Sequence, residues 1–247
     1  MMVGILYGVG VGPGDPDLIT VKGMRILQQV PVVAFPAGTG GKPGIAQQIV
    51  TPWLRSGQVE LSLKFPFVQD EAVLQHAWQV AAKTVWDVLR QGQDVAFVSE
   101  GDVSFYSTFT YLAQTVQCLD PAVEVKPIPG VASPMAAAAA LGLPLTVRSQ
   151  RLTILPALYT VADLETAIAH ADVIVLMKVS SVYEQVWSVL ANHGLLEHSY
   201  VVERATQPHQ VIYADLRDRP SLQLPYFSLL VVQIAGREKV ENIEKNL

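Results

Sequence analysis

Short apolar runs alternate with longer amphipathic segments through the first half of the chain. The runs at 3–9, 32–35, 59–63, 95–98 and 123–128 are short and apolar, so we expect strands there. Helical patterns occupy 18–28, 43–54 and 70–90. Two further helical patterns follow, one that ends near Cys118 and one that begins after Pro129-Gly130. This alternation predicts an open, mostly parallel sheet with helical crossovers.

The longest helical pattern, 70–90, predicts which side of that helix is buried. Its apolar positions recur at helical spacing, and Gly92 supplies a signal for its end. The face expected to pack on the sheet comprises Val73, Ala77, Val80, Ala81, Thr84 and Val88.

The pattern changes at the polar segment "TVRSQ", 146–150, where we place a domain boundary. Beyond it, strands are expected at 152–155, 173–177, 200–204, 211–214 and 228–234, with helices near 161–169 and 181–192. The last three strands follow one another too closely for helical crossovers, which favours antiparallel pairing. The prediction is two α/β domains, 1–147 with a mostly parallel sheet and 148–247 with a mixed sheet, ending in a solvated segment at 236–247.

Composition narrows the possible partners of the 247-residue chain. Half of the residues are hydrophobic, 16% are charged and the net charge is −5, which disfavours nucleic acid as a partner. The longest apolar run, 131–147, is interrupted by Ser133, Pro134 and Pro144, so no membrane span is expected. The N-terminus lacks a basic signal region and Cys118 is the single cysteine, which favours the cytoplasm and argues against a zinc site.

The glycine-rich segment "YGVGVGPGDPDLIT" follows the first predicted strand, where a dinucleotide-binding fingerprint would stand. Its third glycine position falls on Pro13 or Asp15, depending on which glycine begins the motif. The second strand ends without an acid, and Lys42 is followed by Pro43 rather than a hydroxyl residue. These departures argue against a nicotinamide enzyme and a P-loop.

The segment "AFVSEGDVSFYSTF", 96–109, ends a buried strand in an acid-glycine-acid turn. Gly101 allows close approach of the backbone to a ligand, and Asp102 supplies a hydrogen-bond acceptor. Hydroxyl residues at 104, 107 and 108 stand at the start of the next helix. Two interpretations remain open from the residues alone: a ligand-binding loop, or a helix cap made by Asp102 or Ser104.

Six segments in this order resemble the tetrapyrrole (corrin and porphyrin) methyltransferases that use S-adenosylmethionine. They are "GVGPGDPDLITVKGMRIL", "SEGDVSFYSTF", "PIPGVASPMAAAAALGLPL", "VIVLMK", "VVERAT" and "YFSLLVV". Within that family, "GDVSFYSTF" and "YFSLL" look most like the branch that methylates carbon 20 of precorrin-2, an intermediate of the cobalamin pathway. Val103 stands where many relatives have proline, which relaxes the restraint on this loop.

The resemblance implies a homodimer of two-domain subunits, with S-adenosyl-L-methionine in the cleft between the domains. It places Glu100, Gly101, Asp102 and Phe105 along one wall of the cofactor site, and Ala132 and Ser133 along a second. Across the cleft, it places near the adenosine Met177, Ala205, Thr206, Ser228, Leu229 and Leu230.

The first glycine-rich loop is implied to face the tetrapyrrole, which makes Gly12, Pro13 and Asp15 substrate-side residues. Asp15 is a candidate general base for the proton that leaves after methylation, although it could instead cap a helix beginning near Pro16, and water could take the proton. Candidate partners of the substrate carboxylates are Lys22, Lys64, Arg148 and Lys178. Other readings are a related methyltransferase with another acceptor, as in diphthamide synthesis, and a non-catalytic small-molecule-binding protein.

Overall fold

The computed structural model describes residues 2–38, 40, 42–66, 68, 70–157 and 160–234. The chain divides into two compact units, Met1–Ser133 and Pro134–Leu247. The division falls between the first and second residues of the helix that starts at Ser133, whereas the sequence analysis placed the domain boundary after that helix. The boundary at 147 stays a prediction. The expected solvated end at 236–247 lies outside the described residues.

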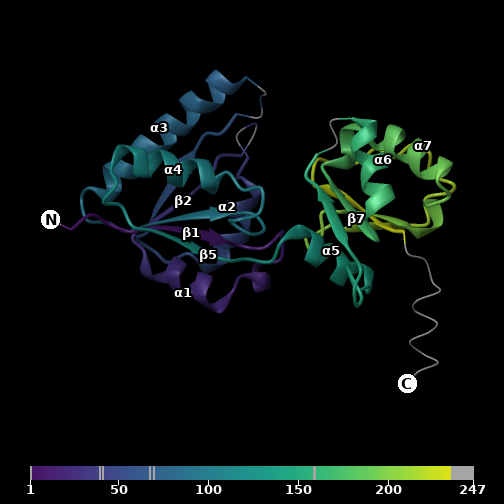
Figure 1. Cartoon of the computed structure of the whole chain (residues 1–247). Helices are drawn as coiled ribbons and strands as arrows, with labels where there is room; N and C mark the ends of the chain where they lie inside the picture. Colours follow the sequence, from purple (N-terminus) through teal and green to yellow (C-terminus); the bar gives the residue numbers. More distant parts are fainter. Residues whose placement is uncertain are drawn as a thin grey trace. The chain divides into compact units, whose positions relative to one another are not determined.

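The first unit contains a five-stranded sheet in the order β3-β2-β4-β1-β5, and every pair in it is parallel (Figure 1). This confirms the predicted parallel sheet. Its strands are β1 (Leu6–Gly10), β2 (Val32–Pro36), β3 (Val59–Leu63), β4 (Val95–Ser99) and β5 (Val125–Ile128). The helices are α1 (Val21–Gln29), α2 (Ile45–Val50), α3 (Glu71–Leu89) and α4 (Phe109–Leu119), with 3-10 turns at Pro16–Leu18 and Thr51–Trp53.

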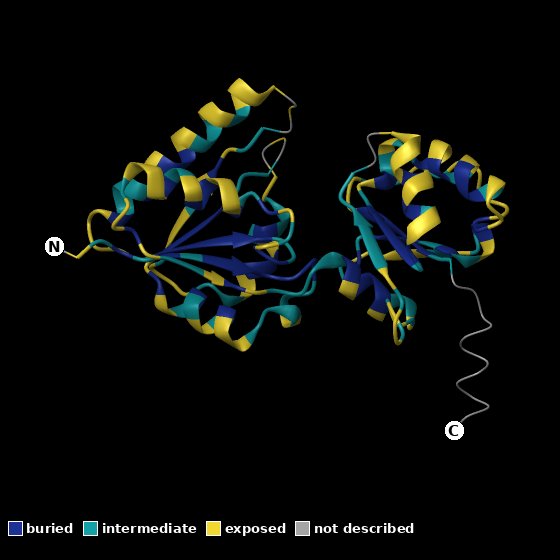
Figure 2. Ribbon diagram, viewed as in Figure 1, coloured by how far each residue is buried: buried dark blue, intermediate teal, exposed yellow. Residues whose placement is uncertain are grey.

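Helices cover both faces of this sheet because successive side chains of each strand point to opposite sides. In β4, Phe97 joins the core beneath α3 and α4, while Val98 joins the core beneath α1 and α2. The central strands are accordingly buried, β4 along its whole length and β1 at every residue except the half-buried Tyr7 (Figure 2). The strand interiors are continuous apolar runs for that reason.

Two helices differ from the sequence prediction. The pattern at 43–54 becomes a short α2 followed by a 3-10 turn, because Pro52 cannot continue an α-helix. The predicted buried face of α3 is wrong at Val73 and Val80, which are 45% and 53% exposed. The side chains of α3 that pack into the core are Ala81, Ala82, Val85 and Leu89. Contact with the sheet and α4 selects that stripe, and the first turns of α3 stay exposed (Figure 2).

The second unit contains a mixed five-stranded sheet in the order β6-β7-β10-β8-β9. Only its β6–β7 pair is parallel, so the predicted antiparallel pairing of the last three strands is confirmed. The strands are β6 (Leu152–Leu155), β7 (Val173–Met177), β8 (Ser199–Glu203), β9 (Val211–Ala214) and β10 (Ser228–Gln233). The helices are α5 (Ser133–Leu141), α6 (Val161–His170) and α7 (Tyr183–Asn192), with 3-10 turns at Val179–Ser181 and Leu196–His198. Helices α6 and α7 pack on one face of this sheet.

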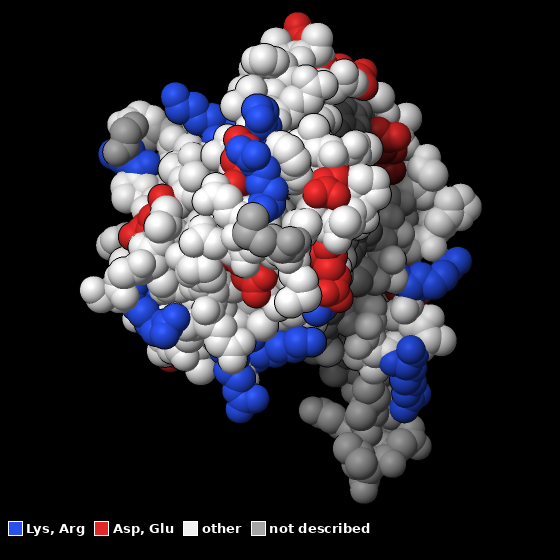
Figure 3. Space-filling view, turned by 90° about the vertical axis from the view of Figure 1, so that its left-hand side faces the viewer, with Lys and Arg blue, Asp and Glu red and all other residues white. Residues whose placement is uncertain are grey.

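The face drawn in Figure 3 has no large patch of like charge, because acidic and basic side chains are interspersed on it. Within the described ranges, no helix combines the length and apolar character needed to cross a bilayer.

Candidate functional site

The strand order of the first unit creates a switch point between β1 and β4. The chain leaves β1 toward α1 on one face of the sheet and leaves β4 toward α4 on the other. The loops after these adjacent strands therefore diverge at the carboxyl edge of the sheet. In open α/β sheets such a crevice is where ligands bind.

Two glycine loops meet at this switch point. The Gly101 N–H donates to the Gly12 carbonyl at 2.8 Å, and the Gly12 N–H donates to the Gly101 carbonyl at 3.2 Å. Both glycines are left-handed, with φ of +69° at Gly101 and +78° at Gly12, a conformation that residues with a Cβ rarely adopt. The loop expected at the substrate and the loop expected at the cofactor are thus joined directly.

A third loop packs against this pair so closely that side chains are excluded. A Cβ on Gly130 would lie 2.3 Å from the Gly101 carbonyl oxygen, and one on Gly10 would lie 2.7 Å from the Gly130 nitrogen. We call Gly10, Gly12, Gly101 and Gly130 the glycine junction. It brings the ends of β1, β4 and β5 into backbone contact.

The space beside Gly101 is bordered by the residues predicted to form the second wall of the cofactor site. A Cβ on Gly101 would lie 3.8 Å from Ala132 Cα and 4.0 Å from the Ser133 nitrogen. Ala132 and Ser133 are half-buried, as is Phe105. The structure therefore brings both predicted walls within the first unit together, with the Gly101 turn packed against the Ala132-Ser133 backbone.

Asp102 holds the β5 loop to the β4 loop. One of its carboxylate oxygens accepts the Gly130 N–H at 2.8 Å, and the other accepts the N–H and hydroxyl of Ser104. Burial opposes the charge, but these hydrogen bonds outweigh it and hold the pKa of Asp102 below its ordinary value. Capping of α4 by Asp102 or Ser104, one of the open interpretations, is wrong: Thr108 occupies the cap position without a side-chain bond.

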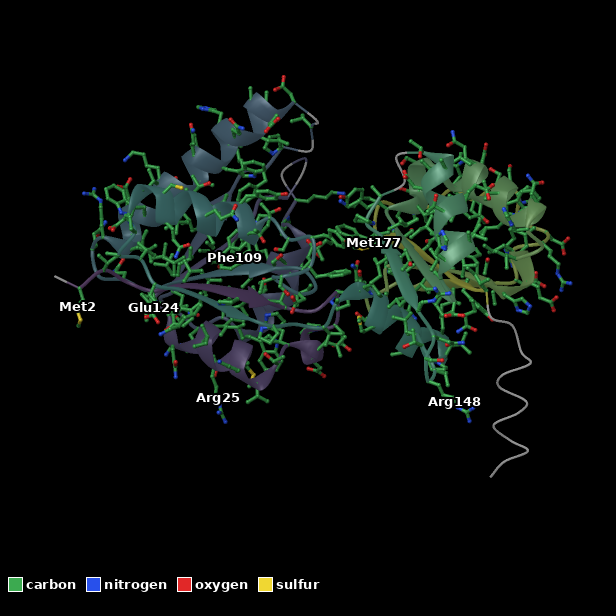
Figure 4. The ribbon with its side chains drawn as sticks, in the orientation of Figure 1. Met2, Arg25, Phe109, Glu124, Arg148 and Met177 are labelled. Atoms are coloured by element: carbon green, nitrogen blue, oxygen red, sulfur yellow. The ribbon has the colours of Figure 1, made fainter. Side chains whose placement is uncertain are left out.

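Hydrogen bonds and packing on the core side also stabilise the turn at 100–102. Ser99 Oγ and Ser107 Oγ are 2.8 Å apart, and Ser107 Oγ accepts the Phe109 N–H at 3.1 Å. The Phe109 ring lies between α4 and the sheet (Figure 4), and a Cβ on Gly8 would lie 2.3 Å from it. Val103, which replaces the proline of many relatives, is 2% exposed and packs in the same core. Packing thus restrains this loop where proline is absent.

Glu100 is the acid on the other side of Gly101. Its carboxylate accepts a hydrogen bond from the Ala46 N–H in the first turn of α2, and the residue is only partly exposed. Burial raises the pKa of Glu100 to about 7, although the Ala46 hydrogen bond acts in the opposite direction. Glu100 therefore exchanges a proton near neutral pH.

The substrate-side residues occupy the start of the β1–α1 loop. Gly12 and Pro13 are buried, and Asp15 is half-buried. Asp15 Oδ1 accepts the Asp17 N–H at 2.9 Å and caps the 3-10 turn at Pro16–Leu18. The capping alternative is confirmed, and a role for Asp15 as general base stays a prediction.

The predicted residues of the second unit gather at one edge of its sheet. Met177 ends β7 opposite Leu229, and Ser228 begins β10 opposite Glu203. Ala205 and Thr206 follow directly after β8. Leu230, in contrast, is fully buried in the core beneath α6 and α7.

Backbone conformation marks the same edge. Lys178, Arg204 and Thr206, which flank Met177 and Ala205, all have positive φ. Such strained conformations cost energy and concentrate at functional sites. The Thr206 N–H donates to Gln210 Oε1 at 2.7 Å, which supports the turn.

Sequence reasoning missed Glu203 at this edge. Glu203 is 6% exposed, stands opposite Ser228, and accepts a hydrogen bond from the Tyr213 hydroxyl. Burial and the neighbouring Glu203 charge raise the pKa of Tyr213. The sequence did contain a signal for Glu203, because it is an acidic residue at the end of an apolar strand in "VVERAT".

The basic side chains considered for the substrate carboxylates are all exposed. Lys22 lies in the first turn of α1, and Lys64 comes directly after β3 at the carboxyl edge of the first sheet. Lys178 Nζ lies 6.0 Å from the centre of the Tyr226 ring. Among the described residues, no three side chains of the metal-binding types cluster together.

These features define a two-unit α/β protein whose candidate site is built on glycine loops at the carboxyl edge of its first sheet. The chain belongs to the tetrapyrrole (corrin/porphyrin) methylases, whose family profile matches residues 5–219. This family uses S-adenosylmethionine as its methyl donor.

Relatives and solved structures agree with that assignment. The cobalt-precorrin-2 C(20)-methyltransferase of Salmonella typhimurium is 33% identical over 94% of this chain and 97% of its own length. The cobalamin biosynthesis protein CobIJ of Mycobacterium tuberculosis is 35% identical over 96% of this chain, which spans only 47% of that longer protein.

Among solved structures, the cobalt precorrin-4 methyltransferase CbiF superposes with a TM-score of 0.71 at 27% identity, covering 93% of this chain and 95% of CbiF. The uroporphyrin-III C-methyl transferase of Thermus thermophilus, solved with S-adenyl homocysteine, gives a TM-score of 0.66 at 20% identity, covering 97% and 100% of the two chains, and supports the fold alone.

Proposed function

We propose that the protein transfers a methyl group from S-adenosylmethionine to carbon 20 of precorrin-2, or of its cobalt-containing counterpart, in cobalamin biosynthesis. The observation that carries the substrate assignment is the near-complete match to a C(20)-methyltransferase, along 94% of this chain. The similarity of "GDVSFYSTF" and "YFSLL" to the same branch supports it.

The packing around Gly101 supports a site for the methyl donor there. The Ala132-Ser133 backbone lies at van der Waals distance from the position of a Gly101 Cβ, and the junction joins the surrounding loops through backbone contacts. The residues proposed to hold the donor are Glu100, Gly101, Asp102, Phe105, Ala132, Ser133, Met177, Ala205, Thr206, Ser228, Leu229 and Leu230. Gly12, Pro13 and Asp15 are proposed to face the tetrapyrrole.

The bound donor supplies an electrophilic methyl group on a sulfonium centre. The chain's main task is alignment, because an enamine-like ring carbon attacks that methyl group only when the two lie in line and close together. The glycine junction holds two loops rigidly for this purpose, and ionised Asp102 fixes the third.

After transfer, a proton must leave the methylated carbon. Asp15 is the substrate-side acid predicted for this step from the sequence, and its carboxylate also caps the turn at Pro16–Leu18. We further propose that the protein acts as a homodimer, as the family resemblance implies.

Two measurements test the proposal. Calorimetry with S-adenosylmethionine should show binding, and incubation with precorrin-2, metal-free and cobalt-loaded in parallel, should add one methyl group at carbon 20, located by NMR with a ¹³C-labelled donor. A methyl group on another ring carbon would assign the chain to a different corrin branch. No binding of the donor would instead favour a non-catalytic binding protein.

A further inference from the structure

Glu100 occupies a position that the alternation of β4 sets. Ala96 and Val98 point into the core beneath α1 and α2, and Glu100 continues that row one residue beyond the strand. Its carboxylate therefore meets α2 rather than α4, and accepts the Ala46 N–H there. The residue remains partly exposed at the carboxyl edge, directly beside Gly101.

The surroundings of this carboxylate provide little charge compensation. Ala46 and Ile49 of α2 are 1% and 3% exposed, and neither α2 nor β2 contains a titratable residue. The titratable groups in the neighbouring segments are Lys42 before α2, Asp15 and Asp17 between β1 and α1, and Asp102 after β4.

The pKa values of the two acids that flank Gly101 are consequently shifted in opposite directions. Asp102 accepts hydrogen bonds from Gly130 and Ser104 and has a lowered pKa, whereas Glu100 is desolvated and has a pKa of about 7. A pair of carboxyl groups separated in this way provides one fixed charge and one group that exchanges a proton.

A purely structural role would be a tie between β4 and α2. That role needs only an acceptor for the Ala46 N–H, which a neutral amide would supply equally well. Methyl transfer, in contrast, produces a proton, and a base is most effective when its pKa lies near the working pH. The location beside the glycine junction places such a base where the reaction is proposed to occur.

We propose that Glu100, rather than Asp15, accepts the proton that leaves the methylated ring carbon. This inference rests on the proposed function. The sulfonium carbon–sulfur bond breaks as the new carbon–carbon bond forms. The carbon–hydrogen bond of the methylated carbon then breaks, its electron pair restores the ring double bond, and the proton passes to a Glu100 oxygen and later to water.

The test compares Glu100→Gln with wild type in single-turnover methyl transfer from saturating S-adenosylmethionine to precorrin-2, from about pH 5.5 to 9. The amide keeps the shape and the acceptor for Ala46 but cannot take a proton. The wild-type rate should fall as the pH drops below about 7. Glu100→Gln should lose about 100-fold or more in single-turnover rate at saturating donor together with that pH dependence, while its melting temperature stays near wild type.

Two variants serve as controls. Glu124→Gln changes an exposed acid just before β5, at the opposite end of the strands (Figure 4), and should leave rate and pH profile unchanged. Asp15→Asn should keep the pH dependence even if its rate falls.

Each remaining outcome is decisive. A Glu100→Gln rate close to wild type, or a lower rate that keeps the pH dependence, would overturn the assignment and leave Glu100 as a structural tie. Loss of the pH dependence in Asp15→Asn would transfer the role to Asp15. A wild-type protein that binds the donor but does not methylate precorrin-2 would instead contradict the proposed function.

Discussion

Gly12 and Gly101 are paired through both of their backbone polar groups, at N···O distances of 2.8 and 3.2 Å. This pairing spans the switch point of the parallel sheet and joins two loops that lie about 90 residues apart in sequence. A change in either loop is therefore transmitted to the other through the backbone.

Replacing Gly101 with valine should abolish binding of the methyl donor while leaving the protein folded. The valine side chain would occupy the space next to the Ala132-Ser133 backbone where the donor is proposed to lie, and the backbone, at φ +69°, would be strained by about 1–3 kcal/mol. Saturating S-adenosylmethionine, at about 100 times its dissociation constant, should stabilise wild type by about 2.7 kcal/mol and the variant by nothing measurable in thermal melts.

Gly57→Val is the matched control, because Gly57 also has positive φ, +89°, but an added Cβ would meet open space. It should lose similar stability and keep the donor-induced shift in melting temperature. Equal shifts in Gly101→Val and wild type would show that the Gly101 turn is not part of the donor site.

Replacing Gly130 with alanine should destabilise the first unit. The new Cβ would overlap the Gly101 carbonyl oxygen at 2.3 Å, and backbone atoms on both sides cannot move independently. We expect a loss of at least about 2 kcal/mol in the free energy of unfolding, measured by urea denaturation. Gly57→Ala should lose less, since it meets only backbone strain; the reverse order would contradict the close packing of the junction.

Asp102 should contribute stability that depends on pH. Its pKa in the folded protein lies below the ordinary value of 3.8, so the contribution is complete above about that pH and disappears as the pH falls through the folded pKa. The difference in unfolding free energy between wild type and Asp102→Asn should accordingly be constant near neutrality and shrink in acid. Asp218→Asn, at an exposed position, serves as control, and a difference that grows in acid would refute the assigned sign.

The protein should sediment as a homodimer at micromolar concentration. The proposal rests on the family resemblance and on the apolar composition, which leaves side chains such as Val80 and Tyr111 53% and 48% exposed. Analytical ultracentrifugation distinguishes the two states by mass, and a monomer across that range would contradict it.

The sequence by itself determined the order and type of the elements and the family. Strands 59–63, 152–155, 173–177 and 211–214 begin and end where the apolar runs do, because short apolar segments between polar or turn residues favour strands. Of these, only the strand at 173–177 is also buried along most of its length, so the runs predicted the strands better than their burial. The family's motifs likewise are local strings, and they are readable without coordinates.

Only the tertiary structure decided which side chains meet. The buried stripe of α3 passes through Ala82 and Leu89 instead of Val73 and Val80, because contact with α4 and the sheet selects it. The same holds at the site: Asp102 bonds to Gly130, and Glu100 faces Ala46, across gaps in sequence that no local pattern encodes. The opposite protonation behaviour of these two acids follows from desolvation and hydrogen bonding, both of which exist only once the loops are assembled.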